Sequence, residues 1–138
     1  RDASSRNPKK GDWSKSPNNQ FSYSQESIAK ILNYADIDSE ITLIEGFFDR
    51  TTLNIPTDEI AILHLDGDLY ESVLHPLNNL WKKVAVGGII VIDDFLFDTQ
   101  DDEKFPGARA AVMEFLEKNN CFEYLQSIRG TPYLIRQK

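Results

Sequence analysis

Residues 60–72, with the sequence IAILHLDGDLYES, decide the fold of this chain. The apolar half of this stretch predicts a buried strand, and the acidic half predicts the loop that leaves it. A second stretch, residues 87–95 with the sequence GGIIVIDDF, has the same apolar-then-acidic order. Such runs are typical of central strands in a parallel sheet, and in these sheets ligands bind at the carboxyl ends of the strands. We therefore expect an α/β domain with a ligand site at this edge.

The acids that follow the two strands are Asp66, Asp68, Asp93 and Asp94. Taken one at a time, each has an ordinary structural explanation as a turn former or a helix cap. Taken together, they place like charges close to one another at one sheet edge, which is costly unless a cation neutralises part of the charge. Carboxylate oxygens, waters and substrate oxygens form the octahedral site that Mg²⁺ prefers. The pattern favours a metal site over a purely structural role.

Asp68 has two interpretations that the sequence leaves open. Gly67 allows a sharp turn, so Asp66 and Asp68 are expected to point in different directions and to have different roles. Asp68 could act as general base toward a substrate hydroxyl. It could equally cap the helix that begins near Tyr70.

The rest of the chain alternates between helical and extended patterns. Residues 1–23 lack an apolar period and are expected to form a mobile arm or lid, and the remainder, 24–138, forms the domain. Periodicity predicts helices over 24–35, from Tyr70 toward Val86, and around 110–116, and strands over 41–48, 60–66, 89–92, 122–128 and 133–135. This order predicts a three-layer α/β sandwich whose mostly parallel sheet ends in an antiparallel hairpin.

Composition narrows the class of partner. The 138 residues suit one domain, and a net charge of −7 argues against nucleic acid and anionic membranes, so a small molecule is the expected partner. No run approaches the roughly 20 apolar residues of a membrane span. The single cysteine, Cys121, excludes an internal disulfide and fits a cytoplasmic setting. No signal peptide is evident, although residue 1 is Arg rather than Met.

Three further titratable residues are poor candidates for catalysis. His64 lies within the strand and is expected to be packed or to support Asp66 from behind. His75 falls on the part of a helix expected at the surface. Cys121 is expected to be a plain buried thiol.

Several motifs together resemble the macrocin O-methyltransferase (TylF-type) family. They are Leu65-Asp-Gly-Asp-Leu-Tyr-Glu-Ser72, Gly87-Gly88 with Ile92-Asp-Asp-Phe95, Glu45-Gly-Phe-Phe-Asp-Arg-Thr51, and the segment 106–115 beginning Pro-Gly-Ala-Arg. The resemblance covers roughly residues 24–136. It implies a class I methyltransferase with a Rossmann-like sheet, which uses S-adenosylmethionine and Mg²⁺ to methylate a hydroxyl of a sugar or related natural product.

Carried over by residue, the resemblance implies that Asp66, Asp93 and Asp94 bind the metal and that Asp68 is the base. It also implies that Gly46, Phe47 and Asp66 contact the cofactor, the first two near its adenine. A metal that chelates two neighbouring hydroxyls would orient the acceptor and lower the pKa of the attacking hydroxyl, which agrees with the reasoning from the acids alone. Related catechol O-methyltransferases carry a lysine where this chain has Leu69, so that base is absent here.

One departure from the family concerns the first strands of the fold. The seven glycines include no Gly-x-Gly turn, so the cofactor-binding strands have no counterpart in this sequence. We therefore expect residues 24–138 to be the carboxyl-terminal portion of a Rossmann-like domain, with a possible homodimer as its assembly. The alternatives are a Mg²⁺-dependent phosphoryl-transfer enzyme, which lacks a phosphate cradle here, and a degenerate, non-catalytic binding domain.

Overall fold

The computed structural model describes residues 25–34, 41–93, 95 and 106–138. These residues belong to two compact units. One contains helix α1 (Gln25–Tyr34) and the segment 41–45, and the other contains residues 46–138. Helix α1 agrees with the helix predicted over 24–35. The predicted arm, residues 1–23, lies outside the described residues.

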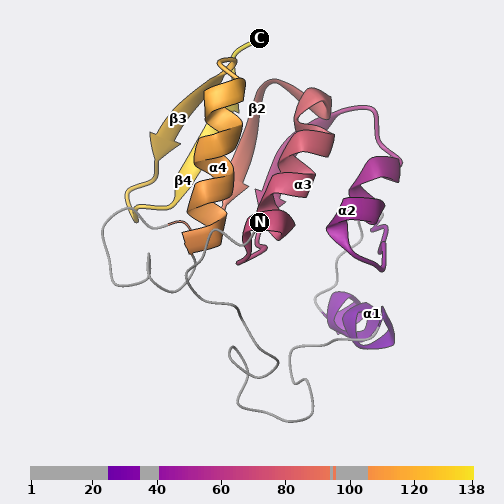
Figure 1. The fold of residues 1–138 in the computed structure, drawn as a ribbon. Helices are drawn as coiled ribbons and strands as arrows, with labels where there is room; N and C mark the ends of the chain where they lie inside the picture. The colour runs from indigo at the N-terminus through magenta and orange to yellow at the C-terminus, as the bar shows by residue number, and fades with distance from the viewer. Residues whose placement is uncertain (1–24, 35–40, 94, 96–105) are drawn as a thin grey trace. The chain divides into compact units, whose positions relative to one another are not determined.

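The larger unit alternates helices and strands as the sequence predicted (Figure 1). Its elements are α2 (Phe48–Thr51), η1 (Thr52–Asn54), β1 (Ile60–Leu65), α3 (Tyr70–Leu80), η2 (Trp81–Lys83), β2 (Val84–Ile92), α4 (Pro106–Lys118), β3 (Phe122–Gln126) and β4 (Pro132–Arg136). The class predicted from the sequence, an α/β Rossmann-like domain, is confirmed.

The sheet has the strand order β1-β2-β4-β3. Strands β1 and β2 are parallel, with Leu65 opposite Ile92, and β4 runs antiparallel to both of its neighbours. The predicted parallel strands and the carboxyl-terminal hairpin are therefore both present. Because β1 and β2 run in the same direction, their carboxyl ends meet at one edge of the sheet.

Strand β2 is longer than predicted. It begins at Val84, whereas the apolar run suggested a strand starting at Ile89. The register explains the difference, because Ile60 pairs with Val84 but Ile62 pairs with Ile89, so an irregularity on β2 absorbs the extra residues. The residues that resembled a continuing helix are thus divided between η2 and the start of β2.

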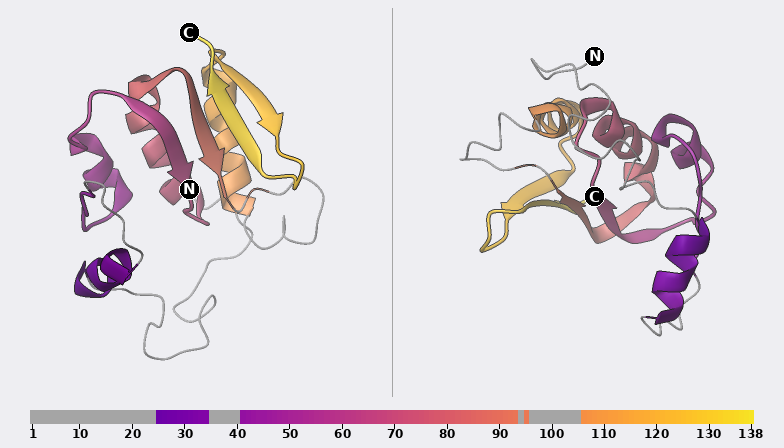
Figure 2. Two further views of the ribbon diagram at one scale, coloured as in Figure 1. Left: turned by 180° about the vertical axis from the view of Figure 1, so that it is seen from behind. Right: turned by 90° about the horizontal axis from the view of Figure 1, so that it is seen from below.

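The core of the unit lies between the sheet and helices α3 and α4. Both helices cover the same face of the sheet (Figures 1 and 2). Alternate residues of the strands point into this core, including Leu63, Ile90 and Leu134, and they meet Leu77 and Phe115 from the helices. The rings of Trp81 and Phe115, and those of Trp81 and Phe122, pack edge to face at the end of the hairpin away from its turn.

The opposite face of the sheet is apolar but much less covered. Seen from behind, the strands lie in front of the helices (Figure 2, left). Ile62 in β1 is 66% exposed, and Ile89, Val91 and Tyr133 on the same face are only half-buried. The described helices of this unit therefore bury one face of the sheet and leave the other less covered.

The predicted strand over 41–48 is wrong. Residues 41–45 have no regular structure, residues 47 and 48 begin a helical turn, and Ile41, Leu43 and Ile44 are all exposed. A strand needs a neighbour for its backbone hydrogen bonds. The described part of the chain provides no such partner for this segment, so its β-branched composition alone does not produce a strand.

Candidate active site

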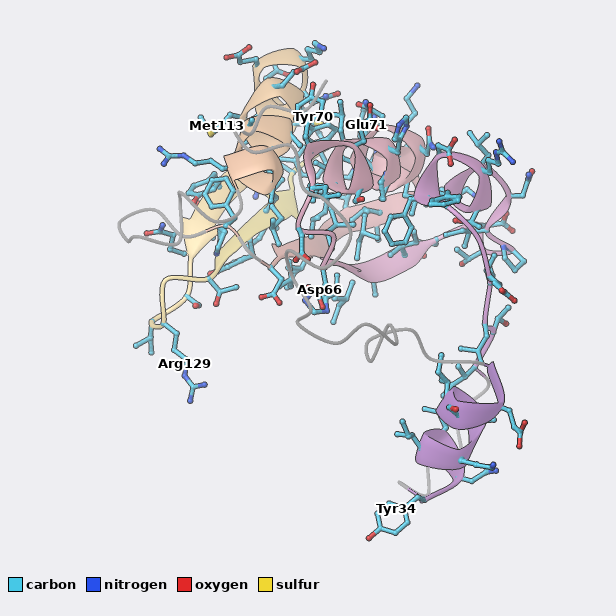
Figure 3. All side chains as sticks on the ribbon, turned by 60° about the horizontal axis from the view of Figure 1, so that its bottom comes forward. Tyr34, Asp66, Tyr70, Glu71, Met113 and Arg129 are labelled. Atoms are coloured by element: carbon cyan, nitrogen blue, oxygen red, sulfur yellow. The ribbon has the colours of Figure 1, made fainter. Side chains whose placement is uncertain are left out.

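Asp66 and Asp93 occupy neighbouring positions at the carboxyl ends of β1 and β2. Each directly follows the last strand residue, and Leu65 and Ile92 are opposite one another. The Asp93 amide donates a hydrogen bond of 2.8 Å to the Leu65 carbonyl, which continues the ladder by one step. Both side chains are exposed, and Asp66 is seen below the start of α3 in Figure 3. The sheet thus brings two carboxylates to one edge, as predicted.

The third expected ligand, Asp94, lies outside the described residues. Within the described ranges, no group of three or more His, Cys, Asp or Glu side chains is arranged to hold a metal ion. Asp66 and Asp93 together offer two hard oxygen donors, which are of the type that Mg²⁺ binds.

Asp68 is held in an unusual backbone conformation. Its φ is +52°, a left-handed value that L-residues avoid, and the Leu69 amide donates to the Gly67 carbonyl around it. Helix α3 has Leu69 at its N-cap and no side-chain cap. The capping interpretation of Asp68 is therefore wrong, because its side chain does not satisfy the first amides of α3.

The sharp turn expected at Gly67 has its left-handed φ at the next residue, Asp68, and not at Gly67 itself. Gly67 is needed instead because a Cβ at this position would lie 2.9 Å from the Ser72 Cβ. Gly67 lets the acidic loop pass close to α3, and Asp68 takes the strained conformation.

A pocket of about 290 Å³ lies beside this loop. One wall is the segment that leads into α2, and the other is the first two turns of α3. The lining residues are Gly46, Phe47, Phe48, Asp49, Glu71, Ser72 and His75. The Phe47 side chain is 81% exposed, so its ring is accessible to a ligand. The pocket combines aromatic surface with carboxylates, a hydroxyl and an imidazole.

Gly46 and Phe47, two of the three residues expected to contact the cofactor, line this pocket. Asp66 does not line it and belongs to the acidic edge. The two features are joined by the loop from Asp66 to Tyr70, since α3 begins where the loop ends.

Sequence reasoning missed most of the pocket. His75, expected on the surface-prone part of a helix, is half-buried and lines the pocket, a position that was not predicted. The signal was its spacing, because His75 comes three residues after Ser72 and four residues after Glu71, which places it beside both on the surface of a helix. His64 was expected to be packed or to support Asp66; its side chain is exposed, on the less covered face of the sheet. Cys121 is a buried thiol, as predicted.

No helix among the described residues has the length and apolar character needed to cross a membrane.

Sequence comparison identifies close relatives. The model of the macrocin-O-methyltransferase (TylF) family matches residues 2–137. Over 112 residues the chain is 33% identical to demethyldecarbamoylnovobiocin O-methyltransferase of Streptomyces niveus, a match that covers 80% of this chain and 40% of that protein. It is 31% identical over 103 residues to a tetracenomycin-C 4'-O-methyltransferase of Streptomyces olivaceus, covering 75% and 36%. The chain therefore spans well under half the length of these curated relatives.

Comparison with solved structures also identifies an O-methyltransferase. The structure of the O-methyltransferase NovP matches with a TM-score of 0.71 and 32% identity, over 83% of this chain and 46% of that one. A methyltransferase from Podospora anserina, solved with SAH bound, shares only 15% identity and a TM-score of 0.59, and so supports the fold alone. From its motifs, its strand order and these matches, the chain belongs to the macrocin-O-methyltransferase (TylF) family.

Proposed function

We propose that this chain is the carboxyl-terminal part of an O-methyltransferase that uses S-adenosylmethionine and Mg²⁺ to methylate a hydroxyl of a sugar or related natural product. The observation that carries the proposal is the placement of an aromatic and acidic pocket next to paired carboxylates at the carboxyl edge of the sheet, in a chain of this family. Sites of this kind lie where ligands bind in open α/β sheets.

The pocket suits the nucleoside end of S-adenosylmethionine. The exposed Phe47 ring offers a flat apolar surface for the adenine, and Asp49 and Glu71 offer acceptors for its amino group and for ribose hydroxyls. A pocket of about 290 Å³ is at the small end of the range for ligand sites, so it would hold only part of the cofactor.

The acidic edge suits a metal ion. Asp66 and Asp93 would supply two carboxylate oxygens, Asp94 would supply a third, and waters and the acceptor would complete six-fold coordination. A metal held here would polarise an acceptor hydroxyl and lower its pKa. If the acceptor carries two adjacent hydroxyls, both could bind the metal ion. We therefore propose a vicinal diol as the acceptor.

Asp68 is the proposed general base. Its carboxylate would take the proton from the attacking hydroxyl, so that the oxygen gains a bond to carbon as it loses its bond to hydrogen. When bound, the cofactor would supply an electrophilic methyl group, whose bond to the sulfonium sulfur breaks as the new carbon–oxygen bond forms and leaves a neutral thioether. Asp68 is half-buried and lies in the loop between the acidic edge and the pocket.

The names of the relatives support the choice of acceptor. One is named as a mycinamicin III 3''-O-methyltransferase of Micromonospora griseorubida, and two others as O-methyltransferases of a novobiocin precursor and of a rhamnosyl tetracenomycin. A glycosylated natural product or its sugar precursor is the acceptor class we propose. A cytoplasmic location and a homodimeric assembly complete the proposal.

Titration calorimetry tests the metal part of this proposal. Mg²⁺, and Mn²⁺ as a tighter-binding probe, should bind the chain, and Asp93→Asn should weaken binding by about tenfold or more because it removes one charged ligand. Glu117→Gln on the exposed face of α4 is the matched control and should bind as the parent chain does. Equal metal binding by the parent chain and the Asp93 variant would remove the metal site from the proposal.

A second titration tests the cofactor part. S-adenosylhomocysteine should perturb the NMR signals of Phe47 and His75, and Phe47→Ala should reduce its affinity. We expect weak binding, because the Gly-rich turn of the family is absent from this sequence. Perturbation confined to residues outside the pocket would contradict the assignment.

A further inference from the structure

The wall of the pocket that carries Phe47, Phe48 and Asp49 has little to hold it in place by packing. Helix α2 is a single turn of four residues, and none of them is buried. A helix of this length is not stable alone, because ordering the backbone of the first turn costs more free energy than its hydrogen bonds provide. Its position must therefore come from specific hydrogen bonds.

Two consecutive threonines provide these bonds. The Thr51 hydroxyl donates to the Phe47 carbonyl at 3.1 Å, and the Thr52 hydroxyl donates to the Phe48 carbonyl. The Phe47 carbonyl also accepts the amides of Arg50 and Thr51, at 3.0 and 2.9 Å. These bonds hold the backbone of the pocket wall.

Thr52 differs from Thr51 in being tied to another element. Its side chain is buried, and its oxygen accepts a hydrogen bond of 2.8 Å from the Asn79 side-chain amide. The amide nitrogen of Asn79 can only donate, so the hydroxyl proton of Thr52 is left to bond the Phe48 carbonyl. The two bonds form a directed relay from Asn79 through Thr52 to Phe48.

Asn79 stands on the same stripe of α3 that forms the opposite wall. Ser72, His75 and Asn79 are spaced i, i+3 and i+7, which places them along one face of the helix. The first two line the pocket and the third holds the wall across from them. One face of α3 therefore provides one wall and positions the other.

We infer that Thr52 and Asn79 are positioning residues that set the separation of the two pocket walls, and through it the affinity for the nucleoside end of the cofactor. The inference rests on the proposed function for the identity of the ligand, but the relay itself concerns only this chain. Gly46 belongs to the same arrangement, because its φ is +144° and a Cβ there would lie 2.8 Å from the Thr51 Cγ2.

Hydrogen exchange measured by NMR on the 138-residue chain tests the relay without any ligand. Thr52→Val keeps the shape of the side chain but leaves the Asn79 amide and the Phe48 carbonyl without their buried partner. We expect the amides of 50–52 to lose protection in Thr52→Val and in Asn79→Ala, while β2 keeps its protection. Thr52→Ser should restore the parent pattern. Thr57→Val and Asn78→Ala, which remove exposed groups outside the relay, are the matched controls.

Unchanged exchange at 50–52 in both relay variants would overturn the inference. Loss of protection throughout the unit, including β2, would overturn it as well, because it would assign the two residues a general role in stability. Local loss with rescue by Thr52→Ser would support it.

Binding of S-adenosylhomocysteine is the second readout. Thr52→Val should weaken it by about tenfold, whereas Thr52→Ser should stay within about twofold of the parent, and Mn²⁺ binding should not change in either. Equal affinity of Thr52→Val and the parent would overturn the inference even if exchange changes. If the parent chain binds no S-adenosylhomocysteine, the proposed cofactor site fails, and the exchange data still decide whether the relay fixes the wall.

Discussion

Asp68 joins backbone strain to proposed chemistry in a single residue. Among the described residues it is the non-glycine position with a left-handed φ, and it lies in the loop that links the acidic edge to α3. Strained backbone of this kind persists where the surroundings determine it, and it gathers at functional sites. The side chain that we propose as base is therefore fixed by its backbone rather than by a cap.

The strain at Asp68 predicts an order of stabilities. Asp68→Gly should be more stable than Asp68→Ala by roughly 1 kcal/mol, because only glycine adopts this φ without steric cost. Asp68→Asn should stay near the parent, since Asn tolerates the conformation. Urea denaturation of the three variants measures this order. Equal stability of the Gly and Ala variants would show that the loop relaxes to a different backbone.

The raised pKa of Tyr124 leads us to expect a loss of folding stability at alkaline pH. Burial raises the pKa of its phenol above 10.0, and a hydrogen bond with Gln126 and the charge of Arg109 offset only part of this effect. The folded state therefore holds the proton more tightly than the unfolded state, and stability falls as the pH rises from about 10 through the folded pKa.

The measurement for Tyr124 is thermal unfolding from pH 8 to 11. Tyr124→Phe should flatten the alkaline fall in melting temperature, because the variant has no phenol to ionise there. Tyr34→Phe, at an exposed position in α1, is the matched control and should leave the fall unchanged. A fall of equal size in the parent and in Tyr124→Phe would assign the effect to other groups.

At the scale of elements, α4 packs closely against the first turn of α3. Gly107 comes so close that a Cβ there would lie 2.5 Å from the Tyr70 amide nitrogen. Further along, the Tyr70 hydroxyl donates to the Glu114 carboxylate, which also pairs with Lys118 at 2.9 Å. Tyr70 is thus held at both its backbone and its ring, at the point where the acidic loop ends.

The close approach at Gly107 reverses the usual effect of alanine in a helix. Alanine is normally favoured over glycine by about 1 kcal/mol. Here Gly107→Ala should destabilise the chain by about 1–3 kcal/mol, since the added methyl group must push α4 away from the backbone of α3. Denaturation measures the change, and Glu117→Ala at an exposed position of α4 should have little effect. A stabilised Gly107→Ala would mean that the helices separate freely.

The sequence predicted the elements that carry their own apolar pattern. The strand at β1, the parallel strand β2 and the hairpin of β3 and β4 follow from runs such as Ile60–Leu65 and from the turn glycine Gly130. The segment 41–48 has the same β-branched composition and still forms no strand. Composition predicts a tendency, but a strand also needs a neighbour.

The site was predictable only in part. The acids at the ends of β1 and β2 were found because their position depends on two local patterns and one rule of topology. The pocket depends on contacts between residues far apart, such as the bond from Asn79 to Thr52, which no local pattern reveals. The backbone strain at Asp68 and the close approach of Gly67 to Ser72 were not predicted, because neither can be read from the order of residues.

At the scale of the whole molecule, the sheet is apolar on both faces, but the described helices of its unit cover one. The less covered face includes Ile62, Ile89 and Val91, next to the outer side of β1, which pairs with β2 alone among the described strands. Apolar faces and bare strand edges favour association with other chains. This agrees with the proposal that the chain is one part of a larger domain.

The less covered face predicts self-association of the 138-residue chain. Sedimentation should show dimers or larger species at micromolar concentration, and Ile62→Lys should reduce them because it places a charge on that face. Ile128→Lys is the matched control: Ile128 is fully exposed, but it lies at the tip of the hairpin. A chain that remains monomeric, or one that both lysines affect equally, would exclude this face as the site of association.

The strand order also bears on how the chain is made. Strand β4 is the latest of the described strands in the sequence, yet it lies between β2 and β3. During synthesis, β1, α3 and β2 leave the ribosome before β3 and β4, so β1 and β2 can pair while the other edge of β2 awaits residues 132–136. The nascent chain therefore exposes an open strand edge until the end of this segment emerges, which is the stage at which a chaperone would protect it most usefully.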